Sequence, residues 1–146
     1  MKSNQQILCL VDKDSQYKDL ERYKKEIARY MSTEFIIKEI DPQEIEWRHE
    51  RKRDGKTRAY MSDTYAQRIS DEAYQEHGNT IDGIQVFAEE KHQQHGDVRL
   101  WGFRIGGRFN GYDVMFVRFR RGYWKTAIHE WLNTVDDYVR YFLGVN

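Results

Sequence analysis

The dipeptide His129-Glu130 has the residue types of a metal ligand with a general base beside it. On a helix, side chains four positions apart lie next to each other, so position 133 is the place for a second ligand. A glutamate directly after the first ligand can take a proton from a metal-bound water. Here Asn133 offers only a neutral amide, a poor zinc ligand, whereas Asp136 offers a carboxylate further along the same stripe.

These residues belong to a helix predicted over positions 123–143, directly after a predicted β-hairpin. At about 100° per residue, its apolar residues gather on one half of the helix surface. The opposite half carries His129, Glu130, Asn133, Asp136, Asp137 and Arg140. We therefore expect one face to pack on a sheet and the other to face a cleft or solvent. A polar face that is merely solvated is the alternative, because a His-Glu dipeptide is common.

The first 40 residues predict a strand, a helix and a second strand. An apolar run at 6–11 is typical of a buried strand. Apolar residues then recur every three or four positions from Leu20 to Met31, which predicts an amphipathic helix. A second apolar run at 34–40 ends at Asp41-Pro42. Such a unit has two parallel strands joined by a right-handed crossover.

The rest of the chain predicts one more helix and three more strands. Positions 43–58 show no clear pattern and are rich in basic residues, whereas 62–76 form a helix that Gly78 ends. A short strand follows at 84–88. Strands at 98–109 and 112–119 flank Asn110-Gly111, a hairpin turn in which both residues take positive φ. The glycines of the first arm indicate an edge strand with a bulge or a close backbone approach.

Length and composition indicate one α/β domain over residues 1–146. We expect a mixed sheet of about five strands, an antiparallel edge hairpin and a C-terminal amphipathic helix. The formal net charge of zero argues against a protein that coats nucleic acid or anionic membranes. The single cysteine, Cys9, lies in an apolar run and is expected to be a buried thiol. We expect a cytoplasmic protein, because neither a signal peptide nor a membrane-spanning run is found.

In the order of its elements the chain resembles the upper subdomain of the zincin metallopeptidases. The matching motif is confined to residues 126–132, Thr-Ala-Ile-His-Glu-Trp-Leu. The resemblance implies Zn²⁺ as cofactor with His129 as a ligand, Glu130 as the catalytic base, and Asn133 and Asp136 at the remaining ligand positions. It also implies a cleft whose rim is the edge strand.

A substrate or partner peptide would then add to that strand by β-augmentation. The residues implied in its binding are Trp101, Phe103, Arg104 and Ile105. Because Asn133 replaces the second histidine and no third ligand follows, the resemblance predicts an impaired or inactive relative, or one piece of a larger assembly that supplies ligands elsewhere.

Two other functions remain open. A non-enzymatic interaction protein, as a homo-oligomer or within a larger complex, would dock through the C-terminal helix and aromatic residues of the hairpin, namely Trp101, Phe103, Phe109 and Tyr112. A nucleic-acid-binding protein, which the net charge disfavours, would use the basic residues of 48–58 together with Arg118, Arg120 and Arg121. The loop histidines His92 and His95 could complete a metal site, although unliganded loop histidines are more common.

Overall fold

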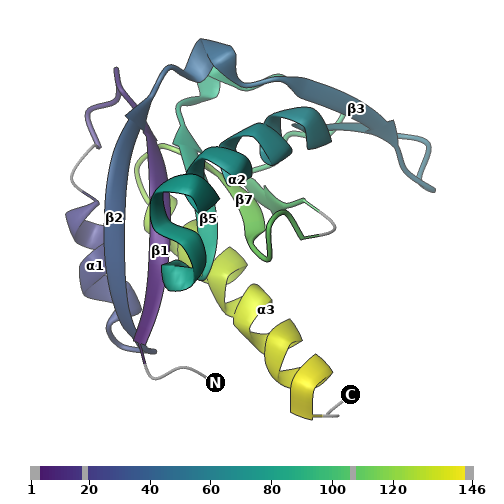
Figure 1. The fold of residues 1–146 in the computed structure, drawn as a ribbon. Coiled ribbons are helices and arrows are strands. Elements are labelled where there is room, and N and C mark those ends of the chain that lie inside the picture. The colour runs from purple at the N-terminus through teal and green to yellow at the C-terminus, as the bar shows by residue number, and fades with distance from the viewer. Residues whose placement is uncertain (1–3, 18–19, 106–107, 144–146) are drawn as a thin grey trace.

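Apolar runs of the sequence form the middle of a five-stranded sheet. The computed structural model describes residues 4–17, 20–105 and 108–143, with side chains as far as residue 134. In this part of the chain the strands lie in the order β2-β1-β5-β7-β6 (Figure 1). They are β2 (Ser32–Ile40), β1 (Asn4–Asp12), β5 (Gly83–Ala88), β7 (Asp113–Arg118) and β6 (Gly102–Arg104). The predicted α/β fold with a mixed sheet of about five strands is confirmed.

Four of the strands are parallel, and the fifth closes one edge in the opposite direction. β1 pairs in parallel with β2 and β5, and β5 pairs in parallel with β7. β6 pairs antiparallel with β7 and forms the edge. The predicted parallel strand-helix-strand unit and the predicted edge strand are both confirmed.

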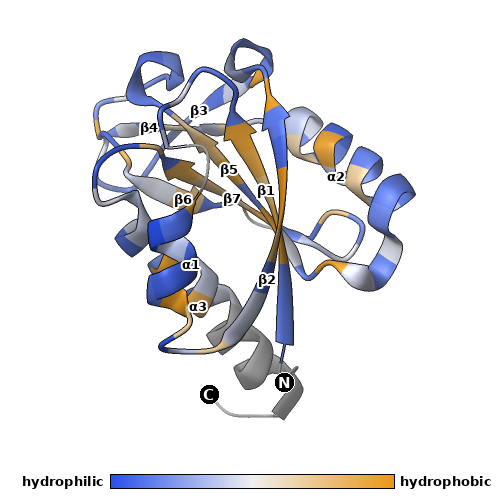
Figure 2. Cartoon of the chain, turned by 90° about the vertical axis from the view of Figure 1, so that its left-hand side faces the viewer, coloured by the Kyte–Doolittle hydropathy of each residue, from blue (hydrophilic) through white to orange (hydrophobic). Residues whose placement is uncertain are grey.

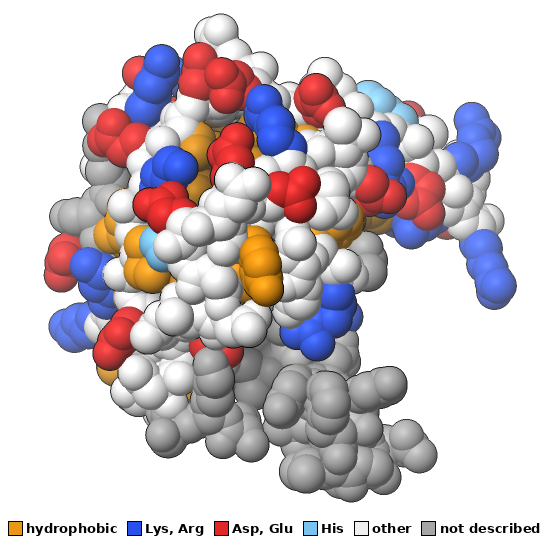
Figure 3. All heavy atoms as spheres, viewed as in Figure 1, with side chains coloured by type: hydrophobic (Ala, Val, Ile, Leu, Met, Phe, Trp, Pro, Cys, Tyr) orange, Lys and Arg blue, Asp and Glu red, His pale blue; other side chains and the backbone are white. Residues whose placement is uncertain are grey.

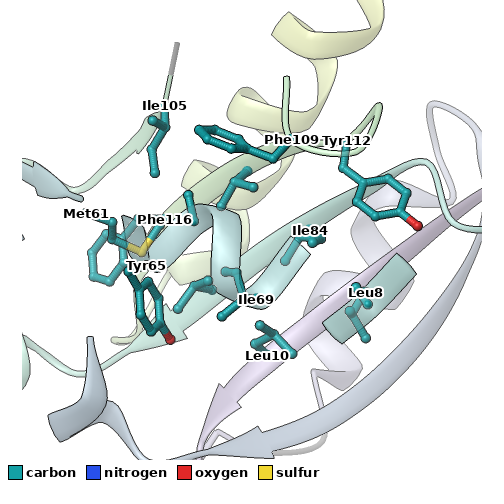
Figure 4. Packing of buried hydrophobic residues seen from close by; sticks show 14 of the residues in the cluster. Leu8, Leu10, Met61, Tyr65, Ile69, Ile84, Ile105, Phe109, Tyr112 and Phe116 are labelled. Carbon is teal, nitrogen blue, oxygen red and sulfur yellow. The ribbon is translucent and has the colours of Figure 1, made fainter. Parts of the chain in front are cut away.

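Helices cover both faces of the sheet, as the apolar strands require (Figure 2). On one face, α1 (Glu21–Ile27) and α3 (Tyr123–Leu143) pack against β1, β5 and β7 and against each other. On the other face, α2 (Asp63–His77) places Tyr65 and Ile69 on Leu10 and its neighbours (Figure 4). Among the described residues, no helix is long and apolar enough to cross a membrane.

Of the two shorter helices, α2 agrees with its sequence prediction, whereas α1 is shorter than predicted. The hydroxyl of Ser62 accepts the Tyr65 N–H at 3.1 Å, and Gly78 ends α2 with a φ of +57°, so this helix is confirmed. The first helix is shorter than predicted, because α1 ends at Ile27 and Tyr30 is exposed. The chain has to turn there, since β2 begins at Ser32, in register with Asn4 at the start of β1.

The segment predicted to be least structured is an antiparallel hairpin, so that expectation was wrong. β3 (Trp47–Arg51) and β4 (Thr57–Met61) pair around a turn in which Gly55 has a φ of +77°. Aromatic rings hold this hairpin on the sheet, with Trp47 5.3 Å from Phe116 and Tyr60 5.1 Å from Phe103 between ring centroids. A two-stranded hairpin needs such packing to be stable. The many charged residues of this segment obscured the strand pattern in the sequence.

The hairpin that carries the edge strand has the predicted turn. Asn110 and Gly111 have φ values of +55° and +85°, and Phe109 and Tyr112 bridge across them. The regular pairing of β6 with β7 is shorter than the predicted strands and covers only Gly102 to Arg104. The bulge expected near Gly106-Gly107 lies outside the described residues.

The chain depends on Gly83 to bring α3 close to β5. A Cβ atom at this position would lie 2.7 Å from Cζ3 of Trp131. Gly83→Ala is therefore expected to lower the free energy of unfolding by about 1–3 kcal/mol, the usual cost of overpacking a core. Urea unfolding monitored by circular dichroism measures this effect.

The matched control is the double variant Gly83→Ala/Trp131→Phe, in which the smaller ring leaves room for the methyl group. We expect the effect of the alanine to be clearly smaller in the Trp131→Phe background than in the native one. An equal loss in both backgrounds would show that contact with Trp131 is not the cause.

Candidate functional site

The first turns of α3 lie directly against the edge strand. A Cβ atom at Gly102 would lie 2.5 Å from Cγ2 of Thr126 and 3.6 Å from Cγ of Glu130. The glycines in the first arm of the hairpin predicted a close backbone approach, and this contact confirms it. The helix turn that bears His129 and Glu130 is thus a neighbour of β6.

Apolar contacts fix which side of α3 faces outward. Ala127, Ile128 and Trp131 are buried against the sheet, whereas His129 and Asn133 are exposed. Over residues 123–134 the two faces are as predicted. The side chains of Asp136, Asp137 and Arg140, expected on the polar face, lie outside the described residues.

A buried amide also anchors the helix. The side chain of Gln85, fully buried in β5, donates a hydrogen bond from Nε2 to the carbonyl of Ala127 at 3.1 Å. Its Oε1 accepts the hydroxyl of Tyr23 from α1 at 2.6 Å. Buried polar groups cost free energy unless they are paired. These bonds therefore help to set the position of α3 along its axis.

His129 and Asn133 lie side by side, as their spacing predicts. Nδ2 of Asn133 is 3.2 Å from Nε2 of His129, so the amide can donate to an unprotonated ring nitrogen. His129 is the one strong zinc ligand of this pair, and in the described part of the chain it belongs to no group of three His, Cys, Asp or Glu side chains that could hold a metal ion. Because the side chain of Asp136 lies outside the described residues, the ligand set that the resemblance implies for His129, Asn133 and Asp136 stays a prediction.

The carboxyl group of Glu130 has an altered pKa. Burial raises the pKa of Glu130 above its ordinary value of 4.5, and the charges of His129 and Arg104 oppose this effect in part. By contrast, hydrogen bonds from Arg58 lower the pKa of the exposed Asp54 to about 2. A desolvated carboxyl group next to a histidine is typical of a general base.

The residues expected to bind a partner divide into exposed and buried ones. Trp101 is 50% exposed, and the guanidinium groups of Arg118 and Arg120 lie 4.6 and 4.1 Å from its ring centroid. The side chains of Phe103 and Ile105 are buried in the core, so they are not available to a partner.

Arg104 is half-buried beside Glu130. Phe109 and Tyr112 are also core residues. The four-residue aromatic surface expected on the hairpin is thus reduced to Trp101.

The basic residues expected to bind nucleic acid are largely engaged. Arg58 and Arg48 pair with Asp54 and Glu50 at 2.9 and 2.8 Å on the β3–β4 hairpin, whose outer end carries further Lys and Arg side chains (Figure 3). Arg118 is buried and donates to Gln93 and to the carbonyl of Leu100.

The two loop histidines lie in different surroundings. His95 is 3.6 Å from Glu90. His92 lies beside Asp12 and Asp14, and these three side chains form a group that could hold a metal ion. The two aspartates were not among the site residues predicted from the sequence. An acidic residue at the carboxyl end of a buried strand was the signal that could have found them.

The predicted nature of Cys9 is confirmed. It is a buried strand residue, and burial raises the pKa of its thiol far above the ordinary value. The thiolate needed for nucleophilic chemistry does not form under such conditions.

We expect Glu130→Gln to be more stable than the native protein at pH 7, with a gain that shrinks as the pH falls toward 4. The folded state binds the Glu130 proton more tightly than the unfolded chain does, because burial raises the folded pKa. Native stability therefore falls as the pH rises from 4.5 through the folded pKa. Urea unfolding at both pH values measures the difference.

Arg104→Gln serves as the control, because Arg104 lowers the pKa of Glu130. Arg104→Gln should make the free energy of unfolding fall more steeply with rising pH when Glu130 is present, but not in the Glu130→Gln background. A stability difference that is the same at pH 4 and pH 7 would contradict the prediction.

Comparisons of this chain with protein-family models, with curated protein sequences and with solved structures gave no match.

Proposed function

We propose that this chain is a zincin-like domain that binds an extended peptide along β6 and does not hydrolyse it. The observation that carries the proposal is the contact between the edge strand and the helix turn of Thr126 and Glu130. A peptide added to β6 would run past His129, Glu130 and Asn133. This proposal keeps the architecture implied by the resemblance and drops the hydrolytic activity.

The edge strand supports peptide binding through its backbone. β6 lies at the end of the sheet order, and no strand pairs with its outer side in the described part of the chain. Trp101 and Ile105 bond to β7 through the Arg118 N–H and the Val114 carbonyl. Because bonded positions alternate along an antiparallel pair, the N–H and C=O of Gly102 point away from β7. These are the groups that β-augmentation uses.

Ligand chemistry supports a domain that does not hydrolyse the peptide. A catalytic zinc needs three protein ligands and an open position for water. At the proposed cleft, His129 is the one described imidazole ligand, and Asn133 is hydrogen-bonded to it. Without a complete ligand set, Glu130 would keep the buried environment of a base but would have no metal-activated water to deprotonate. Its place in the proposed cleft is that of a polar contact for the peptide backbone.

The first experiment tests the zincin arrangement with Asn133→His, which restores the second imidazole. The protein is prepared in a His92→Gln background, so that the separate group at the end of β1 does not contribute. We expect Asn133→His to take up about one more zinc per chain than its parent, measured by mass spectrometry after dialysis. Adding His129→Ala should remove this zinc.

Asn133→Gln is the matched control, because it changes the size of the side chain without supplying a strong ligand. It should take up no additional zinc. If Asn133→His also takes up none, the helix face is not that of a zincin, and the proposal fails.

The second experiment tests peptide binding with a pool of tryptic casein peptides, which are unstructured. In NMR titrations we expect the amide signal of Gly102 to shift, while the amides of β2 do not. β2 forms the opposite edge of the sheet and serves as the internal control. Equal shifts at both edges, or no shift at Gly102, would contradict specific binding along β6.

A further inference from the structure

Asp12, Asp14 and His92 meet where the two central parallel strands end. Asp12 is the last residue of β1, and His92 follows the end of β5 by four residues. From the carboxyl end of β1 the chain goes through α1 to β2 on one side of this strand pair, whereas from the carboxyl end of β5 it goes to β6 and β7 on the other side. The crevice at such a reversal, outside the carboxyl ends of parallel strands, is where open α/β sheets bind ligands.

The carboxylate of Asp12 is held firmly. It is fully buried, and its Oδ1 accepts the Asp14 N–H at 2.9 Å while Oδ2 accepts the Glu89 N–H at 3.3 Å. Each oxygen keeps a further lone pair. A buried carboxylate requires a compensating positive charge or further hydrogen bonds.

The imidazole of His92 points at this carboxylate without reaching it. Nε2 of His92 is buried, has no hydrogen-bond partner among the described residues, and lies 3.7 Å from Oδ2 of Asp12. That separation is too long for a hydrogen bond. It is close to the roughly 3.5 Å between two ligand atoms that share a zinc-sized ion at about 2.1 Å.

Asp14 completes the group from the solvent side. The three ligand atoms all lie within 4.8 Å of one another, and Asp14 is exposed. Closing the group around one ion therefore needs only small movements of side chains. Because three protein ligands leave coordination positions open, those positions would face solvent beside Asp14.

We propose that Asp12, Asp14 and His92 bind one divalent first-row transition-metal ion, Zn²⁺ or Mn²⁺. One imidazole nitrogen with two carboxylate oxygens suits these ions, whereas Ca²⁺ and Mg²⁺ take oxygen ligands almost exclusively. The site lies on β1 and the loop after β5, and it shares no residue with the proposed peptide cleft. It does not rest on the proposed function.

The ion also fastens the loop that leads to the edge strand. Gln93, next to His92, donates to the carbonyl of Leu100 at 2.8 Å and accepts from Arg118 of β7 at 3.0 Å. Metal at His92 would tie this loop to the end of β1. Hydrogen exchange in residues 93–100 should therefore slow when metal binds.

The test is isothermal titration of the EDTA-treated full chain with ZnCl₂ and, separately, with MnCl₂. We expect about one ion per chain for at least one of the two metals. His92→Gln and Asp14→Asn should each weaken binding more than about 10-fold, the lower end of the effect of losing a residue that merely orients a ligand. Asp14 is exposed, so its variant should fold even if substitutions at Asp12 do not.

Two control variants separate this site from its surroundings. His95→Gln changes a neighbouring loop histidine, and His129→Ala changes the histidine of α3. Both should bind the ion as the native chain does. The proposal is overturned if the native chain binds neither metal, if Asp14→Asn and His92→Gln bind as tightly as the native chain, or if His129→Ala removes the ion.

Discussion

The close approach of α3 to the sheet is the constraint on which the rest of the structure depends. It is possible because Gly83 and Gly102 present no side chain to the helix, so that Trp131 and Thr126 pack directly on the backbone of β5 and β6. The approach buries the apolar half of the helix and leaves Glu130 half-buried at the sheet edge. A helix held one side-chain layer further away would carry Glu130 into bulk water.

Two candidate sites follow from two different properties of the sheet. The edge site depends on the one strand of this sheet that runs antiparallel, because β6 points its outer backbone groups away from β7 while the first turns of α3 lie against it. The crevice site depends on the parallel strands, because their carboxyl ends bring Asp12 and His92 together from distant parts of the sequence. The long loop between β5 and β6 connects them, and Gln93 of this loop is bonded to Arg118 of β7.

The sequence was informative where a local pattern decided the structure. Periodicity predicted α3, cap residues and core positions predicted α2, apolar runs predicted β1 and β2, and Asn110-Gly111 predicted the turn. The sequence was misleading where contacts between distant residues decided the local structure. Aromatic packing on Phe116 stabilises the β3–β4 hairpin, and the pairing of Ser32 with Asn4 limits the length of α1. For the same reason His129 and Asn133 could be predicted as neighbours, whereas the meeting of Asp12 with His92 could not, since it requires the register of two strands.

The position of α3 in the chain has a consequence for synthesis. Together with α1, Tyr123, Ala127 and Trp131 of α3 cover the face formed by Ile7, Cys9, Val11, Phe87, Met115 and Val117. Every strand of the sheet precedes α3, so this face of a nascent chain is only partly covered until α3 has left the exit tunnel. Such surfaces attract other chains. The interval between the emergence of β7 and that of α3 is thus the period in which this face is most exposed to other chains.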